Sequence, residues 1–118
     1  MTRERQAATP SVQRYASVVR LRPDRQDDYL QLHANAWPSV LAQITASGIT
    51  NYSIFLRDGY LFSYFEYRGV DFDADMTAMA KDPETQRWWA LCHPCQEKLP
   101  SAAPDEQWSP MVEVFHHR

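Results

Sequence analysis

The spacing of hydrophobic residues along the chain changes between a period of two and a helical period, which predicts strands separated by helices. Residues 14–21 alternate between two faces and predict a first strand. Residues 49–56 and 60–67 alternate in the same way, and the tight-turn sequence Arg57-Asp58-Gly59 between them predicts a hairpin. Residues 111–116 predict a last short strand.

Helical spacing governs the segments between these strands. Residues 25–47 predict one long helix, which Pro38 kinks or splits because proline has no backbone N–H to donate. Gly48 is well placed as the C-terminal cap of that helix. Residues 72–80 and 82–91 predict two shorter helical pieces, the second begun by an Asp-Pro pair that supplies an N-cap and a first-turn proline.

The order strand, helix, strand, strand, helix, strand indicates an α+β fold of the ferredoxin-like β-α-β-β-α-β type. Such a fold has an antiparallel four-stranded sheet with helices on one face. We expect one domain over residues 14–118, after a flexible N-terminal tail at residues 1–13. Strand 60–67 is largely apolar on both faces, which predicts that a second copy covers the open face in a homodimer of the dimeric α/β-barrel type.

Charge and hydropathy exclude several kinds of partner. The 12 Lys and Arg residues nearly balance 15 Asp and Glu residues, so no basic surface for nucleic acid is indicated. No apolar run approaches the roughly 18 residues of a membrane-spanning helix. The polar first dozen residues lack the apolar core of a signal peptide. We therefore expect a cytoplasmic protein with no membrane partner.

A histidine lies within the predicted buried stripe of the first helix. Tyr29, His33 and Trp37 are four residues apart, so they lie along one helical face. The same apolar arc is predicted to hold Leu30, Val40, Leu41 and Ile44. A buried imidazole needs a hydrogen-bond partner, and its surroundings tune its pKa, which makes His33 a candidate acid-base group.

Two adjacent tryptophans form a second dense cluster. Trp88 and Trp89 lie on the predicted helix 82–91, where neighbouring side chains point about 100° apart. One ring can then pack in the core while the other lines an opening. Aromatic faces with a polar N–H are suited to binding sugars, although plain core packing also explains such residues.

The sequence Cys92-His93-Pro94-Cys95 has the spacing of a redox or metal motif. It follows a helical segment, whereas a thioredoxin-type pair opens a helix, and no second cysteine pair completes a zinc site. We interpret the cysteines as two reduced thiols in a turn, and we expect no metal and no cofactor.

Several short motifs along the chain match a known family as a set: Tyr29-x-x-x-His33, Trp37-Pro38, Gly48 followed by Asn51-Tyr52-Ser53-Ile54, Leu61-Phe62, Gln86-Arg87-Trp88-Trp89 and Glu113-Val114-Phe115. Together they resemble the L-rhamnose mutarotase family, over about residues 14–115. The resemblance implies a small ferredoxin-like homodimeric isomerase that interconverts the α and β anomers of L-rhamnose without metal or organic cofactor.

The resemblance also implies roles for individual residues. His33 matches the family's catalytic acid-base histidine, Tyr29 and Tyr52 its substrate-binding tyrosines, and Trp88 and Trp89 its sugar-contacting pair. The chain departs from the family pattern at Ala34-Asn35-Ala36, at Ser39 and at residues 92–96. The substrate expected is therefore L-rhamnose or a closely related deoxyhexose such as L-fucose.

The residues alone leave two other functions open, because this architecture hosts many activities. One is a cofactor-free monooxygenase or haem-degrading enzyme of the dimeric α/β-barrel type. The other is a non-enzymatic dimeric binding module, in which His33 is a hydrogen-bonded core histidine.

Overall fold

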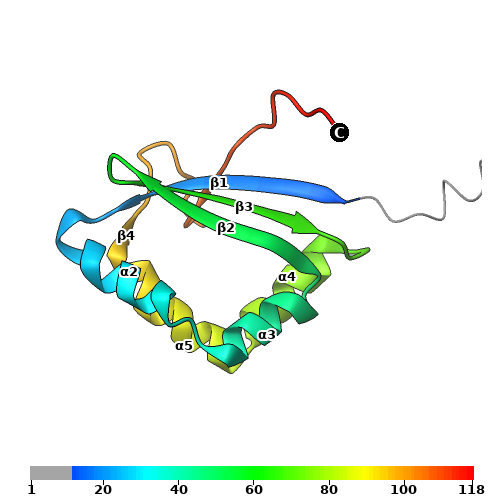
Figure 1. Cartoon of the computed structure of the whole chain (residues 1–118), viewed down its shortest axis with the longest axis horizontal. Helices are drawn as coiled ribbons and strands as arrows, with labels where there is room; N and C mark the ends of the chain where they lie inside the picture. Colours follow the sequence, from blue (N-terminus) through cyan, green and yellow to red (C-terminus); the bar gives the residue numbers. More distant parts are fainter. Residues whose placement is uncertain (1–11) are drawn as a thin grey trace, which may run out of the picture.

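The computed structural model of the chain describes residues 12–118, in which helices cover one face of a curled antiparallel sheet (Figure 1). The strands are β1 (Gln13–Leu21), β2 (Ile49–Arg57), β3 (Tyr60–Tyr67), β4 (Gln96–Glu97) and β5 (Ser109–Pro110). The α-helices are α2 (Gln26–Ala34), α3 (Pro38–Ala46), α4 (Phe72–Lys81) and α5 (Pro83–Cys92). Two short 3-10 turns, η1 (Pro23–Arg25) and η2 (His93–Cys95), flank them.

The strand order is β2-β3-β1-β4, with β5 also pairing with β1, and all of these pairs are antiparallel. This is the order of a ferredoxin-like sheet, so the predicted ferredoxin-like α+β fold is confirmed. Asp58 and Gly59 join β2 to β3 with φ of 54° and 77°. Two consecutive positive φ values are what a two-residue hairpin turn requires, because they match the twist of the strands.

The first helical segment is two helices, as Pro38 predicted. Helix α2 ends at Ala34, and Pro38 is the first residue of α3, where its missing N–H costs nothing. Gly48 follows α3 with φ of 84°, in the left-handed conformation of a helix C-terminus.

Part of the predicted apolar arc was wrong. Leu30 and Leu41 are 45% and 51% exposed, whereas Tyr29 and Val40 are buried. Leu30 lies about 100° round the helix from Tyr29, too far to reach the sheet. Leu41, on the separate helix α3, likewise lies about 100° round the helix from the buried Val40.

The core lies between the sheet and the helices. Val19 and Leu61 are cross-strand neighbours on β1 and β3, and both are fully buried. From the helix side, the buried residues packed in the same cluster are Tyr29, Val40, Trp88, Cys92 and Cys95. One face of the sheet is therefore buried by the helices, as expected for this fold.

The predicted strand over residues 111–116 was wrong. The pairing with β1 is made by Ser109–Pro110 instead, and after one further hydrogen bond, from Met111 N–H to the Ala16 carbonyl (2.8 Å), the chain leaves the sheet. Figure 1 shows this C-terminal segment running away from the sheet. Its apolar side chains at 112, 114 and 115 are 80–92% exposed and do not pack on the sheet, although the carboxylate of Glu113 accepts hydrogen bonds from Arg14 on β1 at 2.8 and 3.0 Å.

The N-terminal expectations fall mainly outside the described residues. Residues 1–11 of the predicted tail lie there, and Gln13 belongs to β1, where it pairs with Tyr67. Within residues 12–118, none of the helices has the length and apolar character needed to cross a bilayer.

Candidate functional site

His33 lies near the C-terminal end of α2 and is partly buried. Its Nδ1 is 2.9 Å from the backbone carbonyl oxygen of Tyr29, one turn earlier in the helix. A carbonyl only accepts, so Nδ1 carries a proton and donates it. In the neutral ring, Nε2 then holds the lone pair and is the nitrogen that can accept a proton.

Aromatic rings fix the orientation of this imidazole. The His33 ring stacks on Tyr29 with centroids 4.2 Å apart, and it meets Trp88 edge-on at 5.2 Å. Trp37 packs edge-on against Trp88, with the ring centroids 5.2 Å apart. The predicted stripe therefore meets the tryptophan of α5, although His33 and Trp88 are 55 residues apart in sequence.

A pocket of about 290 Å³ opens beside the imidazole. It is lined by His33, Ala36, Val40, Leu41, Ile44, Tyr52, Ile54 and Trp88. A cavity of about 110 Å³ adjoins it and shares four of these residues, and Trp89 belongs to its wall. Four of the five predicted site residues thus line this pair of cavities: His33, Tyr52, Trp88 and Trp89.

A larger hollow of about 510 Å³ lies between α2 and the C-terminal end of α5, lined among others by Asp28, Asn35 and Leu91. Its lining does not include His33, and it is the more open of the two. The pocket beside His33 is therefore the better candidate site of the two, since it is more enclosed and is lined by a histidine that can accept and donate protons.

Tyr52 reaches the pocket from the sheet. Its ring packs edge-on against Phe65, 5.7 Å away, and burial of its hydroxyl raises its pKa to about 12. The residue as a whole is 43% exposed. A phenol with this pKa stays protonated at neutral pH and serves as a hydrogen-bond donor.

Tyr29 lies deeper than the other predicted residues. It is 3% exposed, and its hydroxyl accepts a hydrogen bond of 3.2 Å from Gln96 on β4. The Gln96 amide in turn accepts from Gln107. Tyr29 contacts His33 through its ring and carbonyl, and it is not part of the lining of the 290 Å³ pocket. Gln96 was missed from the sequence, because a two-residue strand leaves no periodic pattern.

Helix α5 holds the two tryptophans in place. Asp82 caps its N-terminus by accepting from both the backbone N–H and the hydroxyl of Thr85, each at 2.9 Å. Trp88 points inward and is 7% exposed, whereas Trp89 is partly buried and stacks on His93 at 5.6 Å. The adjacent rings therefore differ in depth, and both line the 110 Å³ cavity.

The cysteines lie at the end of α5. Cys92 and Cys95 are free thiols and both are buried. Burial raises the pKa of Cys92 to about 12, so its thiol remains protonated and unreactive at neutral pH. Among residues 12–118, no three His, Cys, Asp or Glu side chains gather as ligands for a metal ion.

Comparison with known proteins identifies the family. The family model for L-rhamnose mutarotase matches residues 14–117. An L-rhamnose mutarotase from Shouchella clausii is 34% identical over 105 residues, which cover 87% of this chain and 96% of the relative. One from Oceanobacillus iheyensis is 29% identical and covers 89% and 98% of the two chains.

Solved structures agree on the fold. An L-rhamnose mutarotase from Formosa agariphila superposes with a TM-score of 0.67 at 23% identity, over 90% of this chain and 99% of that one. A tetracenomycin F2 cyclase from Streptomyces glaucescens reaches 0.66 at 15% identity, over 90% and 96%. The fold is thus shared by proteins of different activity, and the sequence match separates them. The chain belongs to the L-rhamnose mutarotase family.

Proposed function

We propose that this protein interconverts the α and β anomers of L-rhamnose, with His33 as the acid-base residue. The observation that carries the proposal is the state of the imidazole. Nδ1 is bonded to the Tyr29 carbonyl, Nε2 is the basic nitrogen, and the ring lines a pocket walled by aromatic and aliphatic side chains. At about 290 Å³, the pocket lies near the lower end of the range for small-molecule sites, roughly 300–1,000 Å³, which suits a monosaccharide.

Anomer exchange requires two proton transfers. A proton leaves the anomeric hydroxyl, another arrives at the ring oxygen, and the bond between C1 and the ring oxygen breaks to give the open-chain aldehyde. Rotation about the C1–C2 bond presents the other carbonyl face, and the reverse transfers close the ring. An imidazole both accepts and donates protons near neutral pH, so we assign one of these transfers to His33.

The other predicted residues supply binding. Tyr52 carries a neutral hydroxyl at the pocket wall, which suits a hydrogen bond to a sugar oxygen. Trp88 and Trp89 offer ring faces to the C–H groups of the sugar. Tyr29 stays a predicted substrate-binding residue, and its contacts with His33 also support a role in holding the imidazole.

We further propose that the protein acts as a homodimer joined through the open face of its sheet. Phe55 on β2 is 64% exposed on that face, beside its cross-strand neighbour Phe62. The C-terminal segment adds exposed Val112, Val114 and Phe115. A single chain leaves this apolar surface in water, which favours burial against a second copy.

The test is sugar exchange measured by saturation-difference NMR. Catalytic amounts of the protein are expected to transfer saturation between the anomeric protons of α- and β-L-rhamnose faster than buffer does. L-fucose and common hexoses form the comparison panel, since the departures at Ala34-Asn35-Ala36 and Ser39 bear on which sugar is preferred. No acceleration with L-rhamnose or with any deoxyhexose would reject the proposal.

A further inference from the structure

Strand β2 contains an irregularity next to the site. Thr50 pairs with Glu66 and Ser53 pairs with Tyr64, so Asn51 and Tyr52 together stand opposite the single residue Phe65. Two residues opposite one is a β-bulge, which adds one residue to one strand and reverses the alternation of side chains beyond it.

The reversal decides where Tyr52 points. Ile49 pairs with Tyr67, and Ile54 pairs with Ser63. Ile49, Tyr67 and Ser63 are buried against the helix layer, and Ile54 is partly buried there. Ile49 and Ile54 are five residues apart and would face opposite ways in a regular strand. The bulge between them lets both face the helices. Without it, counting from Ile49, position 52 would point to the open face, away from His33.

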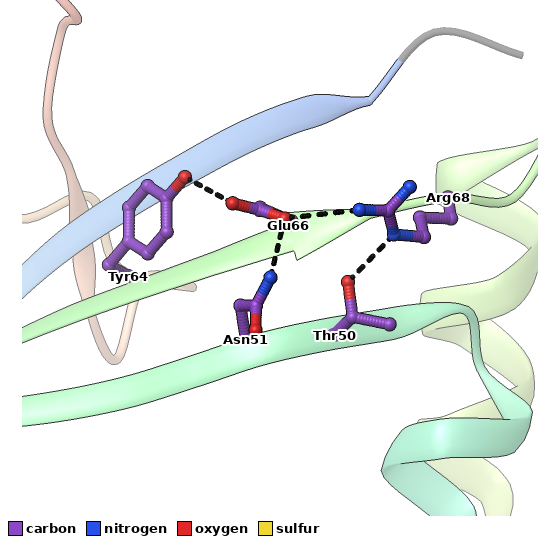
Figure 2. A network of polar contacts seen from close by, with 5 residues as sticks. All are labelled: Thr50, Asn51, Tyr64, Glu66 and Arg68. Carbon is purple, nitrogen blue, oxygen red and sulfur yellow. Dashed lines mark hydrogen bonds and ion pairs between the residues drawn. The ribbon is translucent and has the colours of Figure 1, made fainter.

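The bulge is built on Asn51. This residue has φ of 50°, in the left-handed region that asparagine tolerates better than most side chains. Its Nδ2 donates to a carboxylate oxygen of Glu66 at 2.8 Å. Figure 2 shows Asn51 and Glu66 pointing toward each other across β2 and β3.

The carboxylate of Glu66 is itself fixed from several sides. It accepts a hydrogen bond from the Tyr64 hydroxyl at 2.9 Å and pairs with Arg68 at 3.5 Å (Figure 2). Arg68 also donates from Nε to the Thr50 hydroxyl, on the residue before the bulge. The hydrogen bond from Asn51 contributes most to lowering the pKa of Glu66, so the carboxylate stays charged at neutral pH.

We propose that Asn51 and Glu66 are positioning residues, which act from the open face of the sheet to hold Tyr52 in the pocket of His33. Asn51 supplies the backbone conformation of the bulge, and Glu66 locks its side chain. Neither touches the pocket. The inference rests on the proposed function in one respect, namely that Tyr52 binds a sugar. The position of the Tyr52 ring can be measured separately from that activity.

The test compares Asn51→Val with Asn51→Gly. Valine disfavours positive φ and cannot bond to Glu66, whereas glycine loses the bond but adopts the conformation freely. We expect Asn51→Val to lower kcat/KM for L-rhamnose on the order of ten-fold, as a displaced pocket group does, and Asn51→Gly to restore most of it. Ser53→Val places the same side chain on the same exposed face beyond the bulge, and it is expected to leave activity unchanged.

A double-mutant cycle separates positioning from general destabilisation. In a Tyr52→Ala background, Asn51→Val is expected to cause less than about a two-fold further loss, because the group it displaces is gone. Glu66→Gln, which keeps an acceptor for Asn51, is expected to lower activity less than Glu66→Ala. Equal losses from Asn51→Val in both backgrounds would overturn the proposal.

A structural measurement keeps this test apart from that of the sugar reaction. NOEs between the Tyr52 and Phe65 rings are expected in the parent and in Asn51→Gly, and are expected to vanish in a folded Asn51→Val. If the parent fails to accelerate any sugar and the NOEs still change in this way, the proposed function fails and the positioning role stands. If they persist in Asn51→Val, the positioning role fails.

Discussion

The Nδ1 of His33 donates to the main-chain carbonyl of Tyr29 across one turn of α2, at 2.9 Å. The helix backbone thereby selects the tautomer of the imidazole without help from a carboxylate. Stacking on the Tyr29 ring, 4.2 Å away, limits rotation of the same group. One residue, Tyr29, thus fixes both the orientation and the protonation pattern of the candidate acid-base group.

Replacing His33 by asparagine tests this arrangement. An asparagine amide at this position can keep the hydrogen bond to Tyr29, but it has no nitrogen that titrates. We expect His33→Asn to lower kcat by about 10²- to 10⁴-fold, the usual contribution of a positioned acid-base group. The measurement is NMR exchange of L-rhamnose, with circular dichroism to verify the fold.

Stability should change little in that variant. His33 is partly buried, and losing its aromatic contacts is expected to cost roughly 0.5–1.5 kcal/mol in the free energy of unfolding. Retention of full activity in a folded His33→Asn protein would remove His33 from the mechanism.

Tyr29→Phe separates the two roles of Tyr29. The substitution keeps the ring and carbonyl beside His33 but leaves the buried Gln96 amide without its acceptor. We expect the free energy of unfolding to fall by about 1–3 kcal/mol, the cost of an unpaired buried polar group, measured by urea denaturation. A rise in KM for L-rhamnose would support the predicted contact of the hydroxyl with substrate, whereas an unchanged KM would contradict it.

The cap of α5 should matter for stability because this helix carries both tryptophans. Asp82→Ala removes the acceptor for the Thr85 backbone and hydroxyl and is expected to cost roughly 0.5–2 kcal/mol in urea unfolding. Asp73→Ala is the control, since Asp73 is an exposed residue inside the first turn of α4 and caps no helix. Equal costs for the two substitutions would contradict the assigned cap.

Alkaline pH should destabilise the fold through Cys92. Its pKa is about 12 in the folded state, raised by burial from an ordinary value of 9.0. Below pH 9 the thiol is protonated in both states, so its full contribution is present. Between pH 9 and pH 12 the unfolded chain releases the proton first, and stability falls by up to about 1.4 kcal/mol per pH unit from this group.

The measurement is urea unfolding of the parent and of Cys92→Ala between pH 8 and pH 11. The variant is less stable at pH 8 because a small cavity replaces the thiol, but its stability should decline less steeply with rising pH. An identical slope of unfolding free energy against pH in both proteins would show that the pKa of Cys92 is not raised in the folded state.

The C-terminal segment offers a test of the dimer. Phe115→Asp places a charge on the proposed interface and is expected to weaken self-association at least about ten-fold, measured by sedimentation equilibrium. Val70→Asp makes a similar change at a residue that is 99% exposed on the loop before α4, outside the open sheet face, and should leave association unchanged. A parent protein that is monomeric at micromolar concentration would contradict the dimer.

The strong local signals predicted most of the fold. Asp58-Gly59 defined the hairpin, Pro38 the division of the first helical segment, and Asp82-Pro83 the start of α5, because each acts on its own backbone. The edge of the sheet was missed. β4 and β5 have two residues each, which is too short for an alternating pattern of apolar and polar residues to appear in the sequence. Their pairing with β1 depends on how the chain folds back in space.

The candidate site was predictable for a different reason. His33 and Trp88 were each candidates because of their residue type, but only the family resemblance placed them in one site. In the structure their ring centroids are 5.2 Å apart. The support behind the site was not predictable. The bond from Gln96 to Tyr29 and the bulge at Asn51 depend on strand pairing, which is set by tertiary contacts.

The extra residue divides β2 into two halves, and the side chains that face the helices fall on odd-numbered positions before it and on even-numbered positions after it. Moving it two positions toward the C-terminus would leave Ile49 and Ile54 facing the helices and would exchange Tyr52 for Asn51 in the wall beside His33. The chemical lining of the pocket is therefore set partly by where one residue is inserted. Shifting that insertion offers a route to altered sugar preference that point substitution within the pocket does not provide.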